Sequence, residues 1–172
     1  MQRAEPQPAY PKKGGPRATA AMLRANGASG GAAMATMARP LCADDERAIV
    51  AVLTRYATGI DTRDWPLFRS CFSEDFEGDF GSFGKWRGPR EITDFMREAH
   101  REVGPTLHRL SNISIEDEGH HVRARSYVDA LLMPLAEGGP IHRGIGCYDD
   151  RMIRSSDGWK IARRIFAAVR LG

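Results

Sequence analysis

Apolar side chains follow a helical period in the first half of the sequence and an alternating period in the second half. Between residues 44 and 61 they recur every three or four positions, which predicts an amphipathic helix of about four turns. These apolar positions are Ile49, Val52, Leu53, Tyr56 and Ile60. Acidic residues at positions 44–46 favour a helix start there, because the first turn of a helix carries partial positive charge.

Two further helices are predicted before the period changes. Asp64, followed closely by Pro66, is typical of a helix start and predicts a short helix over residues 64–72. Gly88 and Pro89 open a third helix, whose apolar face holds Ile92, Phe95, Met96 and Ala99. Residues 74–88 are rich in glycine and aromatic side chains, which favours a short hairpin between these helices.

The second half of the chain predicts four long strands. Residues 106–116 and 122–133 alternate between apolar and polar side chains, and residues 141–154 and 159–171 are bounded by turn sequences. In the second strand, Val122, Ala124, Ser126, Val128 and Ala130 share one side. Three helices followed by an antiparallel meander predict an α+β fold, with the helices on one face of a curved sheet.

Composition indicates one globular domain, with 172 residues, 42% hydrophobic and 27% charged. The net charge of +3 is unevenly placed, because residues 1–43 carry six basic residues and one acidic residue. The remaining 19 basic and 21 acidic residues indicate no nucleic-acid surface. No apolar run approaches the roughly 20 residues that span a bilayer, so we expect no membrane contact. The cysteines, which occur singly and are odd in number, predict reduced thiols and hence a cytoplasmic location.

Residues 1–42 are predicted to form a disordered basic extension, and residues 43–172 the folded domain. The extension is rich in Ala, Gly, Pro and Met, so it cannot bury enough apolar surface to offset the entropy of ordering. Its basic, acid-poor composition is typical of an organelle targeting peptide. The favoured alternatives are translation that starts at Met34 or Met37, or a remnant of cloning.

Cysteine and histidine spacing indicates neither a metal nor a cofactor. Cys42, Cys71 and Cys147 occur singly, and the odd number argues against a disulfide framework. The chain has no CxxC or HxxxH motif and no glycine-rich phosphate loop after a strand. We therefore expect reduced thiols and chemistry that depends on side chains alone.

Asp61 is the residue that local structure does not explain. It stands where the first helix should end, and a carboxylate at a helix C-terminus is disfavoured by a few tenths of a kcal/mol. Asp61 therefore lacks an obvious structural role.

At this point the sequence resembles the SnoaL-like branch of the NTF2-like superfamily over about residues 43–170. The resemblance lies in AVLTRYATGIDTRDWPLFRSCFSEDF (residues 51–76), TLHRLSNISIE (106–116) and DDRMIRSSDGWKIARR (149–164). Relatives include scytalone dehydratase, bile acid 7α-dehydratase, hexachlorocyclohexane dehydrochlorinase, ketosteroid isomerases and the β subunits of ring-hydroxylating dioxygenases. The resemblance implies a cone in which the sheet wraps around the long first helix and leaves an apolar pocket.

The resemblance also implies site residues. In dehydratase-like members an aspartate ending the first helix orients a histidine on the first long strand, and the matching residues here are Asp61 and His108. Asp61 would then fix the imidazole tautomer for general-base catalysis, and His108 would offset the unfavourable carboxylate at the helix end. The alternative is that Asp61 is a solvated turn residue and His108 a core histidine. Tyr56 matches a tyrosine beside the substrate in the bile acid dehydratase type, and Asp129 falls close to a further functional acid of that type. Scytalone dehydratase has a second histidine on the next long strand, where this chain has Leu131 and Leu132.

These residues predict a cofactor-independent lyase or isomerase for a hydrophobic polycyclic or aromatic molecule. His108 would act as base, Asp61 as its orienting group, and Tyr56 as a donor to the substrate oxygen; packing alone would equally explain Tyr56. Asp129 would be a second acid/base group or an ion-pair partner. Candidate pocket residues are Phe80, Phe83, Trp86, Phe95 and Met133.

Two rival hypotheses are a non-catalytic partner subunit, as in dioxygenase β subunits, and a small-molecule binding module. Family members often associate through the outer face of the sheet, so the resemblance implies a homodimer or homotrimer under each of these hypotheses.

Overall fold

The computed structural model describes residues 40–171, so most of the extension predicted over residues 1–42 lies outside the described residues. Three α-helices precede the long strands, as the hydrophobic periods predict. The elements in chain order are α1 (Ala43–Asp61), α2 (Trp65–Arg69), β1 (Phe72–Asp79), the 3-10 turn η1 (Gly81–Phe83), β2 (Lys85–Arg87), α3 (Gly88–Ala99), β3 (Val103–Asp117), β4 (Val122–Pro134), β5 (His142–Ser155) and β6 (Gly158–Leu171).

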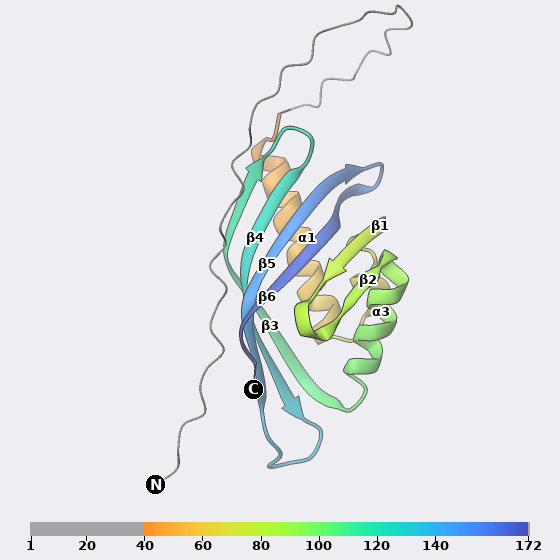
Figure 1. Ribbon diagram of the computed structural model, residues 1–172, viewed down its shortest axis with the longest axis vertical. Helices are drawn as coiled ribbons and strands as arrows, with labels where there is room; N and C mark the ends of the chain where they lie inside the picture. The colour runs from red at the N-terminus through yellow and green to blue at the C-terminus, as the bar shows by residue number, and fades with distance from the viewer. Residues whose placement is uncertain (1–39, 172) are drawn as a thin grey trace, which may run out of the picture. The chain divides into compact units, whose positions relative to one another are not determined.

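The strands form one six-stranded sheet in the order β2-β1-β6-β5-β4-β3 (Figure 1). Strands β3 to β6 form the predicted antiparallel meander, and β1 and β2 form the predicted hairpin. One pairing was not predicted: β1 joins the edge of β6 in parallel, with a register shift between Phe72 and Glu77. Parallel pairing has no local signal, because it joins strands that are far apart in the sequence.

The helix boundaries follow local chemistry. Asp64 accepts a hydrogen bond from the backbone amide of Leu67 at 2.9 Å, which confirms it as the N-cap of α2. Gly88 has φ of +73°, a conformation that glycine adopts readily, and Pro89 follows it at the start of α3. Helix α1 ends at Asp61, as predicted.

One hydrophobic core lies between the helices and the inner face of the sheet. The alternating residues of β4 are buried from Val122 to Ala130, as their shared parity predicts. Helix α1 contributes Ile49, Leu53 and Ile60, which are fully buried. The inner face of β4 is therefore the face that surrounds any cavity, and odd-numbered residues such as Tyr127 face away from it.

An ion pair lies inside this core. Asp150 on β5 faces Arg164 on β6 directly in the strand register, and the two side chains form two hydrogen bonds of 2.7 and 2.6 Å. Both are fully buried, and the Arg164 guanidinium lies between the rings of Tyr56 and Tyr148, at 4.0 and 3.9 Å from their centroids. Burial raises the pKa of Asp150, and the charge of Arg164 opposes this rise.

Candidate active site

A cavity of about 260 Å³ opens between the inner face of the sheet and helix α3. Its wall is mostly apolar, and its polar groups come from histidine and tyrosine side chains. Tyr56 and Tyr148 are buried at its closed part, whereas Phe83 is about half exposed. The lining residues are Tyr56, Phe80, Phe83, Phe95, Met96, Ala99, His100, His108, Val128, Ala130, Leu132, Gly144, Tyr148, Phe166 and Leu171.

Asp61 and His108 meet at the wall of this cavity. The Nδ1 atom of His108 lies 2.7 Å from Oδ1 of Asp61, and the backbone amide of His108 donates to Oδ2 at 2.8 Å. The His108 side chain is only 8% exposed and that of Asp61 19%. Because a carboxylate accepts hydrogen bonds, Nδ1 carries the hydrogen and Nε2 keeps a free lone pair.

The hydrogen-bond network around Asp61 favours its ionised form. Partial burial alone would raise the pKa of Asp61, but the bonds from the His108 ring and backbone, the His108 charge and the Thr106 hydroxyl together lower it. The Thr106 hydroxyl donates to Oδ1 at 2.9 Å. Asp61 therefore holds the His108 ring by Oδ1 and the His108 backbone amide by Oδ2, and it stays ionised near neutral pH.

Arg63 is a functional candidate that sequence reasoning missed. Its guanidinium donates to the carbonyl of Ile60 at 2.6 Å, to the carbonyl of Gly104 at 2.7 Å and to the Thr106 hydroxyl at 2.9 Å. It thus places a cation at the end of α1 and links that end to β3. This explains how the helix tolerates a terminal carboxylate, since the Arg63 cation offsets the charge of the helix C-terminus and His108 hydrogen-bonds the carboxylate.

The backbone at Arg63 has φ of +59°, which is uncommon for a side chain other than glycine. We expect Arg63→Ala to lower the free energy of unfolding by about 1–3 kcal/mol, because the buried carbonyls and Thr106 lose a charged donor. Urea denaturation measures this loss. The matched control is Arg69→Ala, which changes an exposed arginine of α2 and should stay within about 0.5 kcal/mol of wild type. Equal effects in the two variants would contradict this role of Arg63.

Tyr56 lies in the same cavity as His108 and has a second tyrosine beside it. The hydroxyls of Tyr56 and Tyr148 are 3.4 Å apart. Burial raises the pKa of Tyr56 above its usual value, although the Arg164 charge opposes the rise. The Tyr56 hydroxyl therefore stays protonated and can donate a hydrogen bond to a bound molecule.

Three of the five predicted pocket residues line the cavity, and two do not. Phe80, Phe83 and Phe95 contribute to its wall. Trp86 instead stacks behind Phe95, with 4.1 Å between ring centroids. Met133 follows Leu132 on β4, and because neighbouring strand residues point to opposite faces, Leu132 faces the cavity and Met133 does not.

The prediction that Asp129 is a second acid/base group at this site is not supported either, because Asp129 lies on the other face of β4. Its carboxylate accepts hydrogen bonds from Arg143 at 2.7 and 2.9 Å and lies 3.4 Å from Arg109. Its neighbours Val128 and Ala130 line the cavity, so alternation along β4 turns Asp129 to the other face. The structure supports the ion-pair alternative and does not bring Asp129 to His108.

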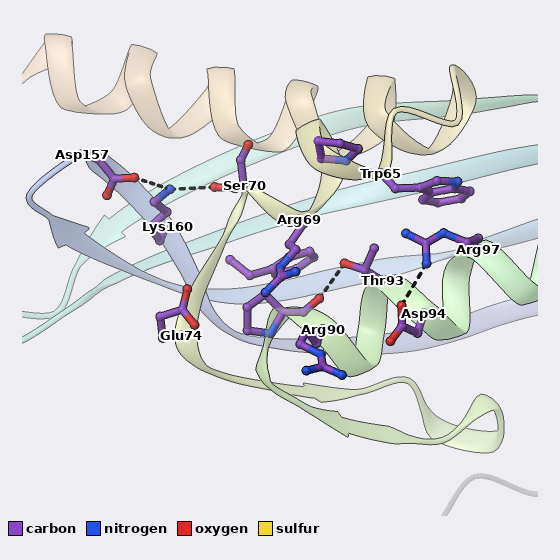
Figure 2. Close-up of a pocket in the computed structure, with 13 residues that line it drawn as sticks. Trp65, Arg69, Ser70, Glu74, Arg90, Thr93, Asp94, Arg97, Asp157 and Lys160 are labelled. Carbon is purple, nitrogen blue, oxygen red and sulfur yellow. Dashed lines mark hydrogen bonds and ion pairs between the residues drawn. The ribbon is translucent and has the colours of Figure 1, made fainter.

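A separate groove of about 480 Å³ lies on the outside of the helical layer (Figure 2). Figure 2 shows that charged side chains pair with each other there: Arg97 with Asp94, and Lys160 with Asp157. None of the predicted site residues lines this groove. The cavity beside His108 is therefore the better candidate, because it is apolar and holds the only Asp–His hydrogen bond within residues 40–171.

The part of the chain that the structure describes contains no group of three or more His, Cys, Asp or Glu residues that could hold a metal ion. Within the same residues, no helix is long and apolar enough to cross a membrane. Within residues 40–171, Cys71 and Cys147 form no disulfide, and the Cys42 thiol donates a hydrogen bond to Oδ2 of Asp45 at 3.1 Å. Burial raises the pKa of the Cys71 thiol to about 11, so Cys71 is not a nucleophile at neutral pH.

Comparison with known proteins agrees with this fold. The sequence model described as the SnoaL-like domain matches residues 42–165. An uncharacterized protein of Mycobacterium tuberculosis is 26% identical over 125 residues, which are 70% of this chain and 83% of that protein.

Two solved structures, from two species of Novosphingobium, have the same fold. A protein of Novosphingobium aromaticivorans described as a scytalone dehydratase has a TM-score of 0.69 and 22% identity, and covers 75% of this chain and 87% of its own. A hexachlorocyclohexane dehydrochlorinase of Novosphingobium barchaimii has a TM-score of 0.68 and 18% identity, and covers 75% and 89%. At these identities the likeness establishes the fold alone.

Proposed function

This chain belongs to the SnoaL-like domain family within the NTF2-like superfamily, and on that premise we propose that it is a cofactor-independent lyase or isomerase. The observation that carries the proposal is the 2.7 Å contact between Asp61 and His108 at the wall of an apolar cavity. Similar proteins described as a dehydratase and a dehydrochlorinase remove small groups from carbon, which supports the reaction class.

The reaction begins when His108 Nε2 takes a proton from a carbon next to a carbonyl group. The electron pair moves into the carbonyl and forms an enolate, and Asp61 stabilises the resulting imidazolium. Tyr56 donates a hydrogen bond to the enolate oxygen, where negative charge develops. When the enolate collapses, a hydroxyl on the next carbon leaves with the proton from His108 as water, or the proton returns elsewhere and the double bond moves.

The cavity volume sets the size of the substrate. A volume of about 260 Å³ is slightly below the range of about 300–1,000 Å³ that is common for ligand pockets. This favours a hydrophobic or aromatic molecule of one or two rings over a larger polycyclic one. Because the wall offers few polar groups, substrates should be largely apolar outside the reacting carbonyl.

Hydrogen exchange in heavy water tests the proton abstraction without knowledge of the leaving group. The purified protein is incubated in D₂O with small cyclic ketones such as 1-indanone and 2-tetralone, and deuterium at the carbon beside the carbonyl is followed by NMR. We expect wild type to accelerate exchange and His108→Ala to lose this acceleration. No acceleration with any ketone that binds would count against a base in this cavity.

Tyr56→Phe tests the proposed donor. A hydrogen bond to a charged group contributes about 1.5–3 kcal/mol, so we expect kcat for exchange to fall roughly 10- to 100-fold. The matched control is Tyr148→Phe, which removes the neighbouring hydroxyl of the same cavity and should have the smaller effect. A larger loss in Tyr148→Phe would move the role from Tyr56 to its neighbour.

A homodimer or homotrimer is also part of the proposal, as is a cytoplasmic location. The outer face of the sheet supports association, because Leu107 on β3 and Tyr127 on β4 are each about half exposed there. Light scattering after size exclusion measures the mass. A partner subunit should aggregate when purified alone, whereas a binding module would bind ketones and leave their exchange rates unchanged.

A further inference from the structure

The His100 side chain forms part of the cavity wall, and one of its ring nitrogens has no partner. His100 follows the last residue of α3 and is 8% exposed. Its Nε2 atom is buried, and within residues 40–171 no hydrogen-bond partner reaches it. Buried polar atoms in native proteins are nearly always hydrogen-bonded, so this lone nitrogen needs an explanation.

The tautomer of His100 follows from its other nitrogen. Nδ1 lies 2.8 Å from the carbonyl oxygen of Met96, and a carbonyl only accepts hydrogen bonds. Nδ1 therefore carries the hydrogen, and Nε2 of the neutral ring is a bare acceptor. Burial lowers the pKa of His100, which keeps the ring neutral near pH 7.

The position of this acceptor relates it to the proposed base. The rings of His100 and His108 line the same cavity, with 6.3 Å between their centroids. A packing role for His100 would need only Nδ1, which ties the ring to the last turn of α3. The free Nε2 matches a hydrogen-bond donor on the molecule in the cavity.

We propose that His100 Nε2 accepts a hydrogen bond from a hydroxyl group of the bound molecule, so that the cavity selects hydroxylated ring compounds. Because Nε2 carries no hydrogen, His100 binds this hydroxyl and does not expel it as water. The bound hydroxyl is therefore one that the product retains. The inference rests on the proposed function only in taking this cavity as the substrate site.

Selectivity follows from the cost of leaving the acceptor unpaired. A site built to hydrogen-bond a hydroxyl rejects an analogue that lacks it, because the buried polar atom then loses its partner. The probes are 2-naphthol and 2-methylnaphthalene, which differ by a hydroxyl in place of a methyl group. We expect wild type to bind 2-naphthol at least tenfold more tightly, as measured by ligand titration.

Two variants identify the residue responsible for this preference. In His100→Leu we expect the two dissociation constants to differ by less than threefold, because the acceptor is replaced by an apolar side chain. In His108→Leu we expect the preference to remain. If the preference for 2-naphthol were lost in His108→Leu and kept in His100→Leu, the inference about His100 would be overturned. The proposed role of His108 as base would not be affected.

A measurement on the wild-type protein tests the same hydrogen bond without a variant, so it remains valid if His100→Leu does not fold. In ¹⁵N-labelled protein, the Nε2 resonance of His100 should move upfield when 2-naphthol is added and stay in place with 2-methylnaphthalene. An unmoved resonance at saturating 2-naphthol would overturn the inference, because a structural water would then already occupy the acceptor. Neither readout depends on turnover, so a failure of the ketone exchange assay leaves this test unaffected.

Discussion

Replacing His108 with alanine, or Asp61 with asparagine, should lower turnover by on the order of 10²-fold or more while the domain stays folded. His108→Ala removes the nitrogen that takes the proton. The loss falls on kcat, because the cavity keeps its apolar wall and continues to bind the ketone. Thermal denaturation of both variants checks that the domain is intact.

Asp61→Asn acts through the tautomer. The backbone amide of His108 donates to one carboxylate oxygen at 2.8 Å, and the His108 ring donates to the other at 2.7 Å. An asparagine has only one acceptor oxygen, so one of these donors must face its NH₂ group. If the backbone keeps the oxygen, the ring is forced into the tautomer with the hydrogen on Nε2, which cannot act as a base.

Matched controls exist for both substitutions. Asp129→Asn changes a carboxylate of β4 that faces away from the cavity, and His142→Ala changes an exposed histidine at the start of β5. Both should leave turnover within twofold, or about 0.4 kcal/mol, of wild type. A wild-type rate in either site variant, or a hundredfold loss in either control, would refute the Asp61–His108 assignment.

Asp150→Ala should produce the largest loss of stability, about 3–5 kcal/mol, because it leaves the Arg164 cation buried without its partner. Both side chains of this pair are fully buried, and a guanidinium cannot lose its proton to escape the cost. Urea denaturation measures the change, with Asp129→Ala as the matched control on the exposed pair with Arg143. The control should cost at most about 1 kcal/mol.

The double variant Asp150→Leu with Arg164→Met separates the lost attraction from the stranded charge. We expect it to be more stable than Asp150→Ala, because no unpaired charge remains in the core. If the double variant is less stable than Asp150→Ala, the contacts of Arg164 with Tyr56 and Tyr148 contribute more than the ion pair. Equal losses in Asp150→Ala and Asp129→Ala would contradict the account of the buried pair.

The secondary structure could be predicted because each element carries its own local signal. The period of α1, the cap at Asp64 and the turn at Gly88 with Pro89 all act over a few residues, and the starts of the three helices agree with the structure. The predicted end of the second helix at residue 72 is wrong, because α2 ends at Arg69 and Phe72 begins β1. The parallel contact of β1 with β6 has no such signal, because it depends on how distant segments pack.

The candidate site was likewise predictable only where the sequence carries a local signal or a family resemblance. The unexplained carboxylate at the helix end marked Asp61 as a candidate, and the family resemblance supplied His108 as its partner. The alternation of β4 already placed Asp129 opposite Val128 and Ala130, so here the strand pattern was a better guide than the resemblance. Arg63 was missed because its bond to the Gly104 carbonyl joins residues that are distant in the sequence, and His100 because its place in the cavity wall depends on how α3 packs against the sheet.

The protonation of the His108 ring tests the central claim most directly. A long-range ¹H–¹⁵N correlation spectrum of the imidazole groups distinguishes the two neutral tautomers in the free wild-type protein. The account predicts that neutral His108 carries its hydrogen on Nδ1, and that Asp61→Asn moves it to Nε2. A wild-type ring with the hydrogen on Nε2 would contradict the account, because the nitrogen in the cavity could not then accept a proton.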